Sequence, residues 1–130
     1  MLGSSAVIAT IAVKDIDAAA KFYEGTLGLT KADIPSPDPS AIMYRSGDSA
    51  ILVYQSSYAG TNQATYASWA VGDDIESVID DLRSKGVGFE QYDNLPGVTR
   101  DGDVHLIDGL KSAWFKDPDG NILNLVNQTM

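Results

Sequence analysis

The chain has 130 residues, of which 44% are hydrophobic and 21% are charged. This length fits one domain, and the balance of residue types excludes a disordered chain, a collagen-like chain and a coiled coil. The sequence contains no cysteine and a single histidine, His105. Disulfides, thiolate metal sites and any site that needs two imidazoles are therefore excluded.

Acidic residues outnumber basic ones by 18 to nine, which gives a formal net charge of −9. The basic residues are scattered along the chain, whereas phosphate binding needs them clustered. We therefore expect neither nucleic acid nor a membrane as a partner, and the negative field favours a neutral or cationic small molecule. The opening apolar run, residues 6–13, is far shorter than the roughly 20 residues of a membrane span. It also lacks a basic leader, which predicts a cytoplasmic protein.

The first half of the chain predicts a strand followed by an amphipathic helix. Residues 6–13 are apolar and rich in β-branched side chains, which predicts a largely buried strand. Asp15 is suited to cap the helix, and Gly28 is suited to end it. The apolar face of this helix consists of Ile16, Ala19, Ala20, Tyr23 and Leu27. We then expect a strand over 30–34, a proline-rich loop over 35–40, and strands over 41–45 and 50–55 joined by a turn at 46–49.

The same pattern begins again after a polar linker at residues 56–63. Residues 65–71 predict a strand, Asp73 and Asp74 offer a helix cap, and Gly86 is suited to end the second helix. The apolar face of this helix matches that of the first at an offset of 59 residues, with Ile75, Val78, Ile79 and Leu82. Strands are predicted over 88–92, 103–107, 112–116 and 122–126, with a loop at 96–101 and a tight turn at 117–120.

This repeated pattern predicts two copies of one strand–helix–strands unit. Neither copy can bury its own sheet face alone, so we expect them to pack as a single domain spanning residues 1–130. The modules are predicted at about residues 5–57 and 65–128.

Three stretches carry a family resemblance: Val-Lys-Asp-Ile at 13–16, Leu-Gly-Leu at 27–29 after Phe22 and Tyr23, and Trp-Phe-Lys-Asp-Pro-Asp-Gly-Asn-Ile at 114–122. Together with the second helix, they resemble the vicinal oxygen chelate superfamily, which includes glyoxalase I, bleomycin and fosfomycin resistance proteins and extradiol dioxygenases. The resemblance covers roughly residues 5–128. It implies an α+β fold of two βαβββ modules that form a curved mixed sheet around a cup-shaped pocket, the glyoxalase/bleomycin-resistance fold.

Catalytic members of that superfamily hold a divalent metal with His, Gln or Glu side chains on the strands of the cup. The resemblance maps these ligand positions onto Ile8, Leu52, Asn124, and either Tyr66 or Ala67. Ile8 and Leu52 have no donor atom, and Asn124 offers only a neutral amide oxygen. We therefore expect no metal, no cofactor and no assigned catalytic residue.

A small-molecule pocket is the interpretation that the remaining residues of the implied cup favour. If Ile8 faces the cup, strand alternation places Thr10 beside it and Tyr66 and Ser68 opposite. Such walls combine apolar surface with a few hydroxyl and amide groups, although the aromatic rings could instead fill the cup as core. The predicted ligand-binding residues are Ile8, Thr10, Tyr54, Tyr66, Ser68, Trp114 and Asn124.

The leading functional hypothesis is a metal-independent small-molecule binding protein that resembles the bleomycin-resistance-type sequestering proteins. The alternative is a glyoxalase-like lyase or isomerase, or a dioxygenase-like enzyme, with an unusual metal site or a metal-free site that uses Tyr66 or His105 as acid or base. A third hypothesis is a partner-binding module whose cup is filled. Outside the enzyme hypothesis, we interpret His105 as a half-exposed strand residue.

A homodimer is the predicted assembly, chiefly because dimers are common in the family that the sequence resembles. The apolar first strand is unsuited to an exposed sheet edge. We therefore expect a two-fold dimer with the first-strand regions at or near an interface that buries more than about 1,000 Å².

Overall fold

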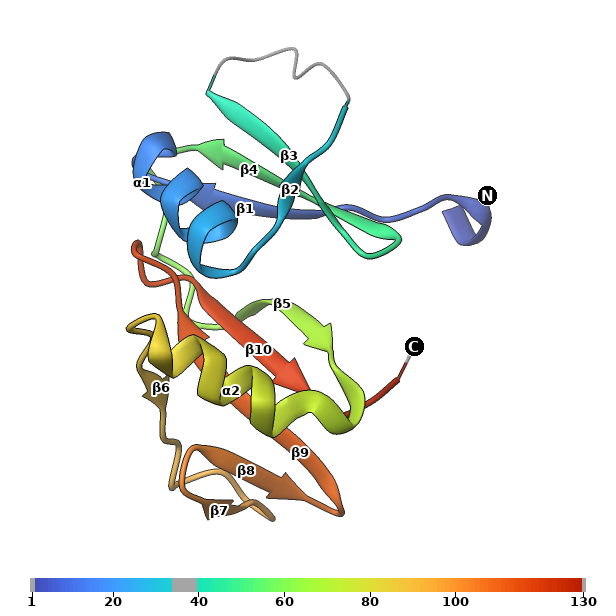
Figure 1. Ribbon diagram of the computed structural model, residues 1–130, viewed down its shortest axis with the longest axis vertical. Helices are drawn as coiled ribbons and strands as arrows, with labels where there is room; N and C mark the ends of the chain where they lie inside the picture. The colour runs from blue at the N-terminus through green and yellow to red at the C-terminus, as the bar shows by residue number, and fades with distance from the viewer. Residues whose placement is uncertain (1, 34–39, 130) are drawn as a thin grey trace. The chain divides into compact units, whose positions relative to one another are not determined.

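The computed structural model describes residues 2–33 and 40–129. The chain divides into two compact units, Met1–Thr61 and Asn62–Met130. Each unit has one β-sheet with a helix packed on one face (Figure 1). The division falls inside the polar stretch at residues 56–63, where the sequence predicts a linker.

The first unit contains a four-stranded sheet in the order β1-β4-β3-β2. Strand β1 runs parallel to β4, and the other neighbouring strands are antiparallel. The described part of the loop predicted at 35–40 is Ser40, and residues 34–39 lie outside the described residues. The elements of this unit are η1 (Leu2–Ser4), β1 (Ala9–Val13), α1 (Ile16–Ala20), η2 (Lys21–Thr26), β2 (Thr30–Lys31), β3 (Ala41–Ser46) and β4 (Ser49–Gln55).

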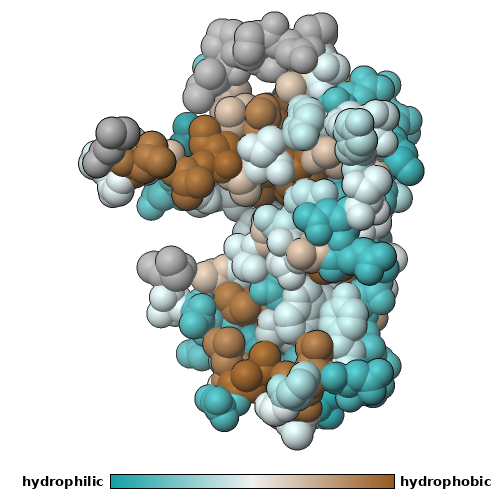
Figure 2. Space-filling model, turned by 180° about the vertical axis from the view of Figure 1, so that it is seen from behind, coloured by the Kyte–Doolittle hydropathy of each residue, from teal (hydrophilic) through white to brown (hydrophobic). Residues whose placement is uncertain are grey.

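The prediction of a largely buried strand over residues 6–13 is wrong for its first three residues. Strand β1 begins only at Ala9, where pairing with β4 begins at Ile51. Val7 is 89% exposed and Ile8 is 45% exposed. Figure 2 shows hydrophobic surface along the N-terminal arm, residues 2–8. Apolar character alone therefore misplaced the start of the strand, because no described strand pairs with the arm.

The first helix begins where the sequence predicts it. The Asp15 carboxylate accepts hydrogen bonds from the backbone N–H groups of Asp17 and Ala18, which are among the donors that a helix start leaves unpaired. The helix continues as the π-helical segment η2, and Gly28 ends it with a positive φ of 75°. Tyr23 is fully buried against the sheet, where its ring stacks on that of Tyr44.

The second unit contains a six-stranded sheet in which β5-β10-β9-β8-β7 are successive neighbours and β6 also pairs with β9. Strand β5 runs parallel to β10, and the remaining pairs are antiparallel. The elements are β5 (Thr65–Ala70), η3 (Gly72–Asp74), α2 (Ile75–Ser84), β6 (Phe89–Glu90), β7 (Thr99–Asp101), β8 (Val104–Ile107), β9 (Leu110–Lys116) and β10 (Ile122–Val126).

Helix α2 covers one face of this sheet (Figure 1) and buries three of the four predicted face residues, Ile75, Ile79 and Leu82. Asp74 occupies the position before the helix, but its side chain makes no capping hydrogen bond, so the predicted carboxylate cap is wrong. A 3-10 turn, η3, leads directly into the helix instead. Gly86 has the predicted left-handed conformation, with a φ of 90°.

Two strand predictions in the second unit need correction. The strand predicted over residues 88–92 shortens to β6, and the loop predicted over residues 96–101 contains strand β7. Strand β7 is fully exposed and polar, so it carries none of the apolar alternation that marks a strand in sequence. The turn at residues 117–120 is confirmed by the hydrogen bond from the Gly120 N–H to the Asp117 carbonyl, at 3.0 Å. Within the described residues, no helix is long and apolar enough to cross a membrane.

Candidate functional site

The sheet of the second unit has one face against helix α2 and an opposite face that we call the open face. The alternation of side chains puts Ala113, Phe115 and Leu125 on the helix side, where they form the core. Residues between them in β9 and β10 point the other way. Strand pairing places these open-face residues beside one another: Ser68 next to Asn124, Asn124 next to Trp114, and Ser112 next to His105.

A buried polar cluster lies on the open face. His105, Ser112 and Asn124 are 0%, 3% and 4% exposed. The Asn124 amide nitrogen donates to the Ser112 hydroxyl at 2.7 Å and to the Ala113 carbonyl at 3.1 Å. Both hydrogen bonds use the nitrogen, so no described residue donates to the amide oxygen Oδ1. Polar groups buried on a sheet face are stable only when they are paired, which makes any unpaired atom here informative.

His105 is fully buried, so its interpretation as a half-exposed strand residue is wrong. Strand β8 lies between β7 and β9, and the aromatic rings of Tyr92 and Trp114 lie 5.7 and 4.9 Å from the imidazole, centroid to centroid. Its Nε2 accepts the Tyr92 backbone N–H at 2.9 Å. Its Nδ1 has no hydrogen-bond partner among the described residues, and no other described buried side chain has such an atom.

Trp114 is the half-buried aromatic centre of this face. Its indole N–H donates to the Thr65 hydroxyl at 3.2 Å, and its ring meets that of Tyr92 edge to face at 5.5 Å. Burial, and to a smaller extent the charge of Glu90, raises the pKa of Tyr92 above its ordinary value. The Tyr92 hydroxyl is therefore uncharged at neutral pH.

Ion pairs border the cluster and hold the strands that carry it. Glu90 pairs with Lys116 at 3.6 Å, and Asp93 pairs with Arg100 at 2.7 Å. The Arg100 hydrogen bond keeps the pKa of Asp93 below its ordinary value. Since each of these cations lies beside a carboxylate, neither pair leaves an unbalanced charge on the open face.

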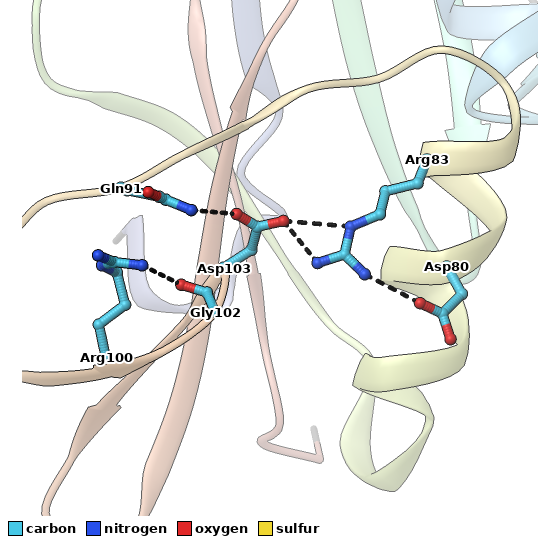
Figure 3. Close-up of polar contacts among 6 residues, drawn as sticks. All are labelled: Asp80, Arg83, Gln91, Arg100, Gly102 and Asp103. Carbon is cyan, nitrogen blue, oxygen red and sulfur yellow. Dashed lines mark hydrogen bonds and ion pairs between the residues drawn. The ribbon is translucent and has the colours of Figure 1, made fainter.

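Asp103 joins helix α2 to the strands around His105 (Figure 3). Its carboxylate accepts hydrogen bonds from the Arg83 guanidinium and from the Gln91 amide, while Arg83 also contacts Asp80. The Arg83 hydrogen bond, and more weakly that of Gln91, lowers the pKa of Asp103. This network fixes the start of β8 and the segment after β6, which are the two segments that contribute His105 and Tyr92.

Of the predicted site residues in the second unit, Ser68, Trp114 and Asn124 share the open face. Tyr66 lies at a register shift in the pairing of β5 with β10, where Thr65 pairs with Ile122 and Ala67 with Leu123. Thr65 therefore contacts Trp114 from the position that simple alternation assigned to Tyr66.

The predicted site residues of the first unit lie on its own sheet. Thr10 and Tyr54 share the face opposite helix α1, because Thr10 pairs with Leu52 and Ala12 with Tyr54. Ile8 lies outside β1.

Four further residues lie on or against the open face and are absent from the predicted set: Thr65, Tyr92, His105 and Ser112. The alternation that selected Trp114 also selects Ser112, two residues earlier in β9, so this residue was detectable from sequence.

The positions at which the resemblance implies metal ligands do not fit a divalent metal. Ile8 and Leu52 carry hydrocarbon side chains, and Asn124 offers only a neutral amide oxygen, which is a weak metal ligand on its own. Among residues 2–33 and 40–129, no group of three or more His, Cys, Asp or Glu side chains is placed to hold a metal ion.

This arrangement of two strand–helix–strands units, with a polar and aromatic sheet face opposite the second helix, defines an α+β protein of repeated βαβββ type. Residues 6–125 match the family model of the Glyoxalase/Bleomycin resistance protein/Dioxygenase superfamily. The chain belongs to this superfamily, which confirms the predicted family and fold class.

Several solved structures have the same fold as this chain. A putative glyoxalase family protein from Bacillus anthracis is 15% identical with a TM-score of 0.71, over 97% of this chain and 96% of that one. A superfamily member from Sphaerobacter thermophilus is 24% identical with a TM-score of 0.68, over 97% and 98%. The fosfomycin resistance protein FosX from Mesorhizobium loti is 14% identical with a TM-score of 0.67, over 100% and 96%. At these identities the likeness establishes the fold alone, and no match is found among curated proteins.

Proposed function

We propose that this protein is a metal-independent small-molecule binding protein, similar in role to the bleomycin-resistance-type sequestering proteins of its superfamily. The observation that carries the proposal is the open face of the second unit, where aromatic rings of Trp114 and Tyr92 lie beside the buried polar cluster. Small-molecule sites combine apolar and aromatic walls with a few polar groups that fix the ligand's orientation. Ser68 and Thr65 extend this surface along β5, and Tyr66, at the register shift between them, belongs to the proposal as a further ligand contact.

A neutral or cationic ligand suits the charges of the chain. The net charge of −9 disfavours an anion, and Arg100 and Lys116 beside the open face each pair with a carboxylate. Thr10 and Tyr54 belong to the proposal as ligand contacts of the first unit, together with Ile8 on the N-terminal arm.

The test is a binding screen by titration calorimetry of the full chain against neutral and cationic aromatic compounds, bleomycin included, with and without EDTA. We expect micromolar binding that EDTA leaves unchanged and that Trp114→Ala weakens at least about tenfold. Tyr58→Ala serves as the control, since this exposed tyrosine lies in the other unit and should leave binding unchanged. Stoichiometric metal in the purified protein, or binding that depends on metal, contradicts the proposal.

An enzyme is the second candidate, as a glyoxalase-like lyase or isomerase or a dioxygenase-like enzyme. The observation that favours it is the position of His105 on the open face, where a single imidazole lies next to Tyr92. Acid–base catalysis needs such a group within hydrogen-bond reach of the substrate. Chemical change in a compound found by the screen, lost in His105→Gln, would establish this candidate over simple binding.

We also propose a cytoplasmic homodimer. The exposed apolar residues of the N-terminal arm, Leu2, Val7 and Ile8, support a contact between copies near the first strand. Sedimentation equilibrium at micromolar concentration tests this, because a dimer has twice the mass of the chain. Val7→Asp should favour the monomer, and a monomeric wild-type protein contradicts the proposal.

A further inference from the structure

One ring nitrogen of His105, Nδ1, has no hydrogen-bond partner among the described residues. Nε2 accepts the Tyr92 N–H at 2.9 Å, and an accepting ring nitrogen carries a lone pair, not a proton. In the neutral ring the proton is therefore on Nδ1, which makes Nδ1–H a donor. This donor is buried and has no acceptor among the described residues. A buried donor without an acceptor costs free energy, and such groups in native proteins often have a functional cause.

The surroundings of this donor indicate what kind of acceptor it could meet. Trp114 contacts the imidazole at 4.9 Å with the rings at 85°, and an aromatic face is only a weak acceptor compared with an oxygen or a ring nitrogen. The indole is half-buried, and the one side-chain hydrogen bond that holds it is its N–H to the exposed Thr65 hydroxyl. A planar ligand that moves the indole aside and stacks against it would bring its acceptor to Nδ1, and Trp114 would remain a ligand contact.

The charged residues of the open face indicate that the ligand is uncharged. Lys116 and Arg100, which share the open face with His105, each pair with a carboxylate, so neither is free to neutralise an anion. Asn124 donates to Ser112, the residue that pairs with His105, and its Oδ1 atom accepts no hydrogen bond from a described residue. The face therefore holds one buried donor that lacks an acceptor, beside the rings of Tyr92 and Trp114, and one amide oxygen that accepts no hydrogen bond from a described residue.

We propose that His105 Nδ1–H is the hydrogen-bond donor that determines ligand specificity on this face, and that the ligand is an uncharged planar aromatic molecule with a hydrogen-bond acceptor on its ring. This inference rests on the proposed binding function and names the class of compound and the residue that selects it. His105 acts here as a specificity residue and transfers no proton.

The first measurement is the protonation pattern of His105 in the free protein. Since the chain has a single histidine, long-range ¹H–¹⁵N spectra of the labelled full chain report it without assignment. We expect the proton on Nδ1 and a lone pair on Nε2. A spectrum with the proton on Nε2 overturns the inference, because Nδ1 would then be an acceptor.

The second measurement compares quinoline with naphthalene, two neutral probes of the same shape at pH 8, of which only quinoline has a ring acceptor. We expect quinoline to bind at least about fivefold more tightly, to shift the Nδ1 resonance and to change Trp114 fluorescence. His105→Gln retains an acceptor for the Tyr92 N–H but removes the Nδ1 donor, so it should abolish the preference. Gln128→Ala, an exposed control in the same unit, should retain the preference.

The outcomes separate this inference from the proposed function. Equal binding of both probes, or an unchanged preference in His105→Gln, overturns the role of His105 while leaving the binding face intact. If neither probe binds at its solubility limit, the ligand class is wrong. If, in addition, no compound of the wider screen binds, the proposed function fails as well.

Discussion

The buried contact between Ser112 and Asn124 allows a quantitative test of how the open face is held together. Ser112→Ala removes one of two acceptors of the Asn124 amide and leaves the Ala113 carbonyl, so we expect a loss of about 1 kcal/mol in unfolding free energy. Asn124→Leu removes the donor from two buried acceptors and should cost about 2 kcal/mol. In the double variant neither polar partner remains, so the loss should be about 1 kcal/mol smaller than the sum of the single losses.

Urea unfolding followed by tryptophan fluorescence is the assay, because Trp69 and Trp114 both lie in the second unit and report on it alone. Ser57→Ala, an exposed serine in the first unit, is the matched control and should change stability by less than about 0.5 kcal/mol. Losses that add to within about 0.3 kcal/mol would show that the two side chains do not stabilise each other, and would refute the reasoning.

Three further predictions concern groups outside the open face. Asp15→Ala should lower the unfolding free energy by about 1 kcal/mol in urea titrations, because it removes the helix cap; an unchanged midpoint would show that the cap contributes nothing. Arg83 holds the pKa of Asp103 below that of the unfolded chain, so this carboxylate stabilises the fold above about pH 4 and loses that effect on acidification. Melting temperatures from pH 7 to 3 should therefore fall less steeply in Asp103→Asn, and parallel curves would contradict this. Burial and the Glu24 hydrogen bond raise the pKa of Tyr44, so its stabilising effect is present below about pH 10 and lost at higher pH. Alkaline melting curves should show this loss in the wild type and not in Tyr44→Phe, and equal curves would exclude it.

The parts of the fold that depend on local chemistry were predictable from the sequence. The cap at Asp15, the left-handed glycines at Gly28 and Gly86, and the turn at residues 117–120 each require only a few adjacent residues. The buried faces of the two helices were predictable in the same way, because apolar residues spaced three or four positions apart lie on one side of a helix.

The features that were predicted wrongly depend on contacts between residues that are distant in sequence. His105 is buried because Tyr92 and Trp114 pack on it from two other segments, and β7, which carries no apolar signal, pairs with its strand. The register shift that moves Thr65 towards Trp114 arises in the pairing of β5 with β10, which neither strand encodes alone. Strand alternation was therefore sufficient to place Ser68, Trp114 and Asn124 on one face, and insufficient to show that His105 is buried on the same face.

Asn124 occupies a position at which the resemblance to catalytic superfamily members implies a carboxylate metal ligand. A carboxylate at this place would be a buried charge and would need a cation as its partner. A neutral amide needs only hydrogen bonds, and Ser112 and Ala113 supply them. Because the Asn124 side chain carries no charge, it needs no cation beside it. The aromatic rings of Tyr92 and Trp114, which contact each other and His105, can therefore pack on this face. Under the proposed binding function, recognition on this face rests on ring contacts and single hydrogen bonds, so binding should depend on the placement of a ligand's acceptor atoms more than on its charge.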